Sequence, residues 1–295
     1  MQDFSGVWVP LVTPFIHDSH SRRREIDFRA LQALARRMAD AGVAGLVACG
    51  STGEAAALDD AEQLAVLDAV IEAVPSCPVV AGLSGSNMEA VQAQQRAIQQ
   101  RAIAGLLVPP PSYIRPSQAG IVAYFHELAD AATVPLILYT IPYRTGVEMQ
   151  LDTIRALAEH PRISAIKDCG GDPDLTMQMI ADGKLQVLAG EDRHMFSTLC
   201  MGGAGIIAAS AHIRPDLFVQ LYQLIRAEKL DTARRLFHRL LPLIGLLFEE
   251  ANPAPVKALL ASQGLLRNEL RPPLQTASNG LLERLLAAQR ELEKA

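Results

Sequence analysis

The residue of this sequence best placed for covalent chemistry is Lys167. It ends a short apolar run, Ile163-Ser164-Ala165-Ile166, that is typical of a buried strand. An amine in low dielectric loses hydration, which lowers its pKa and leaves a neutral nucleophile able to form a Schiff base with a ketone. A single lysine in this position is more often a strand-end residue that reaches water, so the surrounding residues must decide.

The other four lysines have ordinary explanations. Lys184, Lys229 and Lys294 lie in polar segments and are predicted to be solvated. Lys257 opens a helical pattern after Asn252-Pro253-Ala254-Pro255, so its stem is predicted to lie along an apolar face with its amine in water. Lys167 is therefore the one lysine whose context favours chemistry.

Two further residues supply complementary groups after the preceding strand-like run. Tyr139 ends the run 136–139 and offers a phenol that can pass a proton to or from a carbinolamine. Arg144 follows it with a planar fork suited to a carboxylate. Taken singly, Tyr139 also fits a rim aromatic with a wet hydroxyl, and Arg144 fits a surface salt bridge.

The segment Gly50-Ser51-Thr52-Gly53-Glu54 follows an earlier apolar run. Glycines such as Gly50 let the backbone approach a ligand, and the local amides with the Ser51 and Thr52 hydroxyls make an anion cradle. A tight turn is the alternative, and no lysine completes a phosphate loop. Together with Lys167, this segment predicts a small keto acid whose carbonyl meets the amine and whose carboxylate meets the hydroxyls.

These residues must be positioned by alternating strands and helices. Strand-like runs are predicted at 7–12, 45–48, 79–81, 105–108, 136–139, 163–167, 186–189 and 205–208, with a helical pattern after each. Such a series predicts a (β/α)8 TIM barrel over residues 1–227, with a helical appendage, 228–295, packed on it as one structural unit. Because strand ends share one rim, Lys167 and Tyr139 should be neighbours.

Composition excludes several classes of protein. The 295 residues are 49% hydrophobic and carry a net charge of −5, without a basic stripe. This argues against a nucleic-acid or anionic-membrane partner, and the short run Arg22-Arg23-Arg24 is predicted to be a solvated loop. No targeting segment or long apolar run is present, so we expect a soluble, cytoplasmic protein.

No metal or cofactor is predicted. The four cysteines are scattered without a C-x-x-C pair, which indicates neither a disulfide framework nor a zinc site. His17 and His20 lie close together in a polar loop but lack companion ligands. A metal-dependent aldolase is disfavoured because no cluster of histidines and carboxylates falls at the strand ends.

The chain resembles the dihydrodipicolinate synthase and N-acetylneuraminate lyase superfamily. The resemblance covers nearly the whole chain. Its motifs here are Val9-Pro10-Leu11-Val12-Thr13-Pro14-Phe15, Gly50-Ser51-Thr52-Gly53-Glu54, Arg115-Pro116-Ser117-Gln118, Tyr139-Thr140-Ile141-Pro142-Tyr143-Arg144-Thr145-Gly146, Ile166-Lys167-Asp168 and Asn252-Pro253-Ala254-Pro255-Val256-Lys257.

The resemblance implies a homotetramer, or a homodimer, that performs pyruvate Schiff-base chemistry without metal or cofactor. It makes Lys167 the imine lysine and Tyr139 the proton relay. Thr52, together with Ser51, would bind the carboxylate of the keto acid. Arg144 would bind the carboxylate of the second substrate, an aldehyde. Tyr113 would cross from a neighbouring subunit to complete a hydroxyl relay with Ser51 and Tyr139. The remaining pocket positions that it implies are Gly190 and Ile207.

The resemblance leaves the substrate open. Arg144 and Tyr113 favour the synthase branch, that is, a 4-hydroxy-tetrahydrodipicolinate synthase-like enzyme. Ser51, Thr140 and Asp168 depart from the commonest synthase residues. A catabolic 2-keto-acid aldolase or dehydratase of the neuraminate, keto-deoxy sugar acid or hydroxy-oxoglutarate type is the alternative, and a non-catalytic ligand-binding barrel is less favoured. Feedback inhibition by lysine is not expected, because regulated members carry other residues at the positions of Ala55, Asp60, Gln63 and Ser112.

Overall fold

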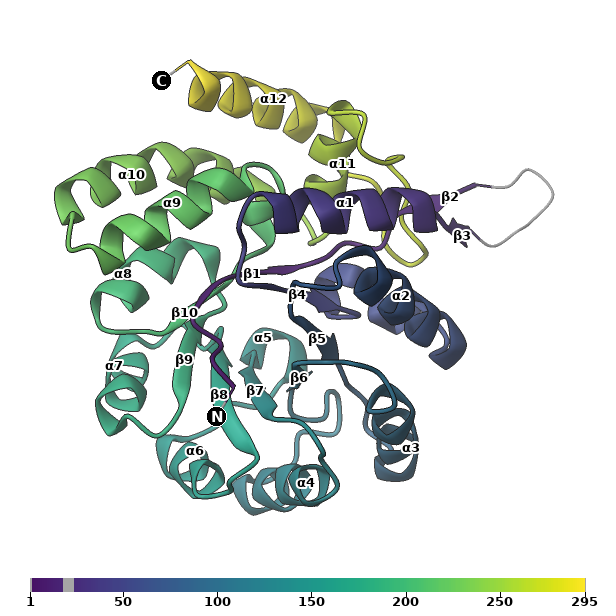
Figure 1. The fold of residues 1–295 in the computed structure, drawn as a ribbon, viewed down its shortest axis with the longest axis vertical. Helices are drawn as coiled ribbons and strands as arrows, with labels where there is room; N and C mark the ends of the chain where they lie inside the picture. Colours follow the sequence, from purple (N-terminus) through teal and green to yellow (C-terminus); the bar gives the residue numbers. More distant parts are fainter. Residues whose placement is uncertain (1, 18–23, 295) are drawn as a thin grey trace.

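The computed structural model describes residues 2–17 and 24–294. Within them, eight parallel strands close into a barrel in the order β1-β10-β9-β8-β7-β6-β5-β4 (Figure 1). The strands are β1 (Gly6–Pro10), β4 (Gly45–Ala48), β5 (Val79–Gly82), β6 (Gly105–Val108), β7 (Leu136–Thr140), β8 (Ile163–Asp168), β9 (Gln186–Ala189) and β10 (Gly205–Ile207). The predicted TIM barrel is confirmed.

A ring of helices surrounds this barrel. They are α1 (Phe28–Asp40), α2 (Asp60–Ala73), α3 (Met88–Ile98), α4 (Gln118–Asp130), α6 (Leu151–Ala158), α7 (Pro173–Asp182), α8 (Met195–Cys200) and α9 (Pro215–Arg226). Short polar side chains start several of them; Asp59 caps α2 in a capping box with Glu62, and Ser117 accepts a bond from the Gly120 amide at the start of α4.

The strands are apolar on both faces because one face meets the helices and the other fills the barrel. The inner face holds a separate cluster that includes Trp8, Val80, Ile137 and Leu188. Trp8 fits only because Gly45 lies beside it, since a Cβ at Gly45 would come within 2.1 Å of the indole ring. Side chains therefore fill the barrel interior, so a ligand of the barrel would bind at its rim.

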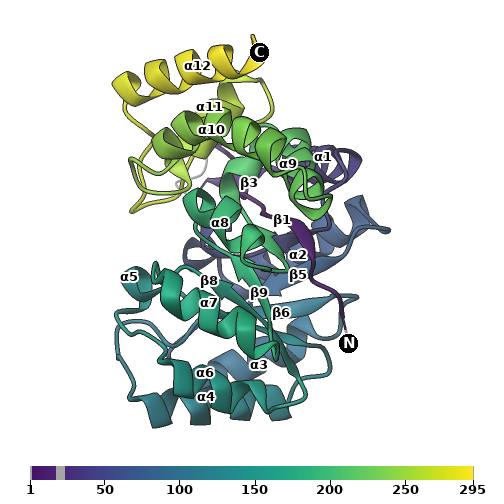
Figure 2. The same ribbon diagram turned by 90° about the vertical axis from the view of Figure 1, so that its left-hand side faces the viewer.

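The C-terminal helices form the appendage, α10 (Leu230–Leu247), α11 (Ala254–Ser262) and α12 (Asn279–Glu293). They lie beyond α9 at one side of the barrel (Figure 2). The predicted boundary at residue 228 falls in the turn between α9 and α10.

The prediction that the Lys257 amine reaches water is wrong. Lys257 is fully buried, and its ammonium forms an ion pair with the equally buried carboxylate of Glu54 and donates to the Glu269 carbonyl across 2.9 Å. Burial lowers the pKa of Lys257 to about 8, although Glu54 opposes that shift. Burying an unpaired ammonium would cost a large desolvation free energy. Here the buried carboxylate of Glu54 compensates the charge of Lys257.

Short elements absent from the sequence prediction complete the rim. The segments β2 (Phe15–Ile16) and β3 (Glu25–Ile26) pair antiparallel, and α5 (Pro142–Thr145) follows β7. Of the predicted loop residues between β2 and β3, His17 is exposed, whereas His20, Arg22 and Arg23 lie outside the described residues. Arg24 is part-buried and bonded to Glu269, so it is not simply solvated.

Across residues 2–17 and 24–294, no helix is both long and apolar enough to span a membrane. The same residues contain no group of three or more His, Cys, Asp or Glu side chains that could hold a metal ion.

Candidate active site

Lys167 projects from β8 into the barrel mouth and is only 6% exposed. Its direction follows from strand alternation, because Ala165 and Cys169 belong to the inner cluster while Ile166 packs outward against the helices. A glycine makes room for its stem; a Cβ at Gly190 would lie 2.9 Å from the Cε and Cγ atoms of Lys167. The predicted pocket position Gly190 thus has a steric reason to be glycine.

Tyr139 is the direct neighbour of Lys167. The two residues are paired in register between β7 and β8, and the amine lies 4.2 Å from the centroid of the phenol ring. Burial raises the pKa of Tyr139 well above its ordinary value, and Cys169 adds to the effect, while Ser51 and Arg144 partly oppose it. The phenol is therefore protonated at neutral pH and can donate a proton to a group formed at Lys167.

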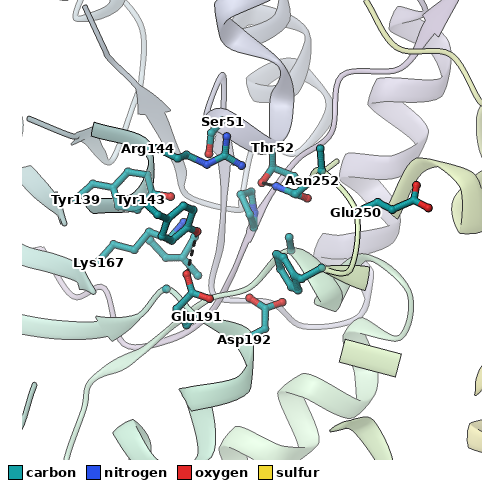
Figure 3. Close-up of a pocket in the computed structure, with 16 residues that line it drawn as sticks. Ser51, Thr52, Tyr139, Tyr143, Arg144, Lys167, Glu191, Asp192, Glu250 and Asn252 are labelled. Atoms are coloured by element: carbon teal, nitrogen blue, oxygen red, sulfur yellow. Dashed lines mark hydrogen bonds between the residues drawn. The ribbon is translucent and has the colours of Figure 1, made fainter. Parts of the chain in front are cut away.

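A cavity of about 450 Å³ opens above these two residues (Figure 3). It brings together seven of the nine predicted site residues, from five different strand ends. These are Ser51, Thr52, Tyr139, Arg144, Lys167, Gly190 and Ile207.

The loop after β4, which carries the Ser51 and Thr52 hydroxyls, forms one wall of the cavity. Residues Ser51–Gly53 make a single tight turn, and Glu54 continues it in the left-handed conformation with φ 55°. The Thr52 hydroxyl is held from outside the barrel, because the side-chain amide of Asn252 donates to it across 2.9 Å. Ser51 and Thr52 both line the cavity, so their hydroxyls are suited to bind a carboxylate close to the Lys167 amine.

The opposite wall is acidic. Glu191 and Asp192 follow Gly190 after β9, and Asp192 accepts a hydrogen bond from the Ser210 amide across 2.7 Å. Burial raises the pKa of Asp192 to about 6, although the Ser210 hydrogen bonds lower it. Arg144 on one side and these carboxylates on the other give the cavity a cationic and an anionic wall.

Two predicted site residues lie outside this cavity. Gly50 lines a neighbouring one of about 260 Å³, which shares Ser51, Tyr139 and Arg144 with the first. Tyr113, on the loop after β6, is 94% exposed with φ 72° and does not line either cavity of its own chain.

Residues 3–291 match the dihydrodipicolinate synthetase family. The chain belongs to that family. Members of the family are class I pyruvate-dependent aldolases and lyases, so the predicted Schiff-base enzyme class is confirmed.

Relatives match nearly the whole chain as well. The 4-hydroxy-tetrahydrodipicolinate synthase of Haloarcula marismortui is 38% identical over 288 residues, 96% of this chain and 92% of that protein. The synthase of Thermodesulfovibrio yellowstonii is 37% identical over 286 residues, 96% of each chain. The crystal structure of the pyruvate complex of Acinetobacter baumannii dihydrodipicolinate synthase superposes with a TM-score of 0.93 at 30% identity, covering 98% of this chain and 99% of that one.

Several residues that line the cavity of this family member were not predicted from the sequence. Tyr143 stands next to Arg144, and Glu191 and Asp192 stand next to Gly190, so adjacency to a predicted residue could have indicated them. Glu250 and Asn252 come from the turn before α11, which folds back over the rim. Asn252 lies in a motif that supports the resemblance, but neither periodicity nor strand position indicates its contact with Thr52.

Proposed function

We propose that this enzyme condenses pyruvate with aspartate semialdehyde, the reaction of a 4-hydroxy-tetrahydrodipicolinate synthase. The observation that carries the proposal is the buried amine of Lys167, 4.2 Å from the Tyr139 ring and facing the Ser51 and Thr52 hydroxyls. A carboxylate at those hydroxyls would place the adjacent ketone carbon within reach of the amine.

The reaction would begin with attack of the Lys167 amine on the ketone carbon of pyruvate. Tyr139 would protonate the carbinolamine oxygen, water would leave, and an imine would form. Loss of a methyl proton then gives an enamine, whose carbon attacks the aldehyde. The amine of the second substrate attacks the imine carbon, closes the ring and releases Lys167, with one water lost per condensation.

The two walls of the cavity support this second substrate. Aspartate semialdehyde carries both a carboxylate, which Arg144 would bind through its planar fork, and an amine, which Glu191 and Asp192 would attract. A neutral sugar chain would use only hydroxyl contacts and leave this charge separation unmatched. The geometry therefore favours the synthase over the aldolases that act on neutral sugars.

We propose in addition that the enzyme works in the cytoplasm as a homotetramer or homodimer. All four cysteines are free thiols, as is typical of a reducing compartment. The exposure of Tyr113 supports such an assembly, in which its hydroxyl would complete the relay with Ser51 and Tyr139 of another copy of the chain.

Reductive trapping tests the imine directly. Borohydride with pyruvate should leave one reduced pyruvate adduct, mapped by peptide mass spectrometry to Lys167. The adduct should be absent in Lys167→Ala and present in Lys184→Ala, whose lysine is exposed. An adduct elsewhere, or none, rules the mechanism out.

Turnover tests the reaction and the role of Tyr139. Wild-type enzyme should consume aspartate semialdehyde with pyruvate far faster than aldoses, and Tyr139→Phe should be slower by about 10²-fold or more. A preference for aldoses would assign the enzyme to the catabolic branch, and near-normal turnover of Tyr139→Phe would remove the relay from this residue.

A further inference from the structure

A tyrosine from one strand end is bonded to a glutamate from another, and the contact crosses above Lys167. Tyr143 lies in α5 directly after β7, and Glu191 lies just after β9. The Tyr143 hydroxyl donates to the Glu191 carboxylate across 2.9 Å (Figure 3). Since β8 lies between β7 and β9 in the barrel, this bond spans the end of the strand that carries Lys167.

The two bonded side chains form a roof, meaning that they lie across the mouth of the cavity above Lys167. Tyr143 and Glu191 both line the cavity, yet Tyr143 is 68% exposed, so one side of its ring faces solvent. Partial burial raises the pKa of Tyr143, with Cys169 and Glu191 adding to the shift, so the hydroxyl keeps the proton that it donates. The adjacent Arg144 guanidinium lies 5.9 Å from the centroid of the Tyr143 ring, which ties the roof to the cationic wall.

We propose that the Tyr143–Glu191 bridge is a specificity-determining strap that limits the length of the aldehyde the enzyme accepts. The inference rests on the proposed function, because it assumes an enamine at Lys167 that attacks an aldehyde. The strap crosses the mouth of the cavity between the ends of β7 and β9. A short aldehyde with a carboxylate reaches Arg144 under this roof, whereas a longer polyhydroxy chain would collide with the Tyr143 ring.

The test compares two aldehyde substrates in variants that remove either the whole Tyr143 side chain beyond Cβ or only its hydroxyl. We would measure kcat/KM with pyruvate for aspartate semialdehyde and for D-arabinose, and take the ratio of arabinose to semialdehyde. Tyr143→Ala should raise this ratio by about 10-fold or more, the size expected when a steric block worth about 1.4 kcal/mol is removed. Tyr143→Phe keeps the ring but loses the bond, so its ratio should fall between those of wild type and Tyr143→Ala.

Two further variants serve as controls. Glu191→Gln keeps an acceptor for the Tyr143 hydroxyl but removes a charge proposed to attract the semialdehyde amine, so it is compared by its kcat/KM for arabinose alone, which should change less than in Tyr143→Phe. Met177→Ala removes an exposed side chain on α7, outside the lining of the cavity, and should leave the ratio at the wild-type value. Borohydride trapping of pyruvate on Lys167 is run in parallel for every protein.

The outcomes separate the strap from the proposed function. Wild-type enzyme that fails to trap pyruvate overturns both. Trapping in the wild type with an unchanged ratio in Tyr143→Ala overturns the strap alone. Loss of trapping in Tyr143→Ala also overturns it, since Tyr143 would then belong to the imine machinery. A raised ratio with trapping retained supports it.

Discussion

The side-chain amide of Asn252, in the turn before α11, donates a hydrogen bond to the hydroxyl of Thr52 on the rim of the barrel, 200 residues earlier in the chain. The bond fixes the orientation of a hydroxyl that lines the cavity next to Lys167. The appendage therefore takes part in building the site that the barrel strands begin.

Removing that amide should weaken pyruvate binding more than turnover. In Asn252→Ala the Thr52 hydroxyl loses its donor, and one hydrogen bond of about 1 kcal/mol corresponds to a rise of about 5-fold in the KM for pyruvate. Steady-state kinetics with pyruvate varied would measure it, with Asn279→Ala, on the exposed start of α12, as the matched control. An unchanged KM, or a fall in kcat alone, would contradict this positioning role.

The Lys257–Glu54 pair predicts a large effect on stability. Lys257→Met leaves the Glu54 carboxylate buried without its ammonium partner, which should lower the free energy of unfolding by about 3–5 kcal/mol. Urea unfolding would measure the loss, and the double variant Lys257→Met/Glu54→Gln should recover most of it because no uncompensated charge remains. Lys229→Met, at an exposed position, is the control. Equal stability of Lys257→Met and this control would show that the pair contributes nothing.

His212 predicts a pH dependence of stability. It is fully buried, its Nε2 accepts from the Val12 amide across 3.2 Å, and burial lowers its pKa from 6.5 to about 4. Between these two values the unfolded chain binds more protons than the folded one, so the contribution of His212 is fully present above pH 6.5 and falls as the pH drops toward 4.

The size of that contribution is about 3 kcal/mol across this pH range. In His212→Gln the acid-dependent part should disappear, so the difference in unfolding free energy between wild type and variant should shrink from pH 7 to pH 4. His238→Gln, a substitution of an exposed histidine, is the matched control. A difference that is constant with pH would show that His212 does not titrate in this range.

Tyr113 predicts that activity depends on assembly. If its hydroxyl completes the relay in another copy, Tyr113→Phe should lower kcat by about 10-fold or more without changing the oligomeric state measured by analytical ultracentrifugation. Ile114→Ala, a change at the exposed neighbouring position, is the control. Full activity in a monomeric preparation would exclude the donated tyrosine.

The sequence predicted those features that depend on residues near one another along the chain. Alternating apolar runs predicted the barrel, and two strand ends in succession predicted that Tyr139 and Lys167 are neighbours, now seen in register. It misplaced Lys257 because the compensating Glu54 lies 203 residues away. It missed the Tyr143–Glu191 bond for a related reason, since no periodicity reports which side chains meet across the mouth of a closed barrel.

The long reach of the appendage back to the first strands has a consequence for synthesis of the protein on the ribosome. The Ser51–Gly53 turn emerges early, but the partners of Thr52 and Glu54 are Asn252 and Lys257, which are translated near the end. Until then, the nascent chain carries Lys167 together with a Ser51–Gly53 turn in which Thr52 lacks its Asn252 partner, and the adjacent Glu54 lacks Lys257. The site is therefore completed in one late step, when the C-terminal segment docks.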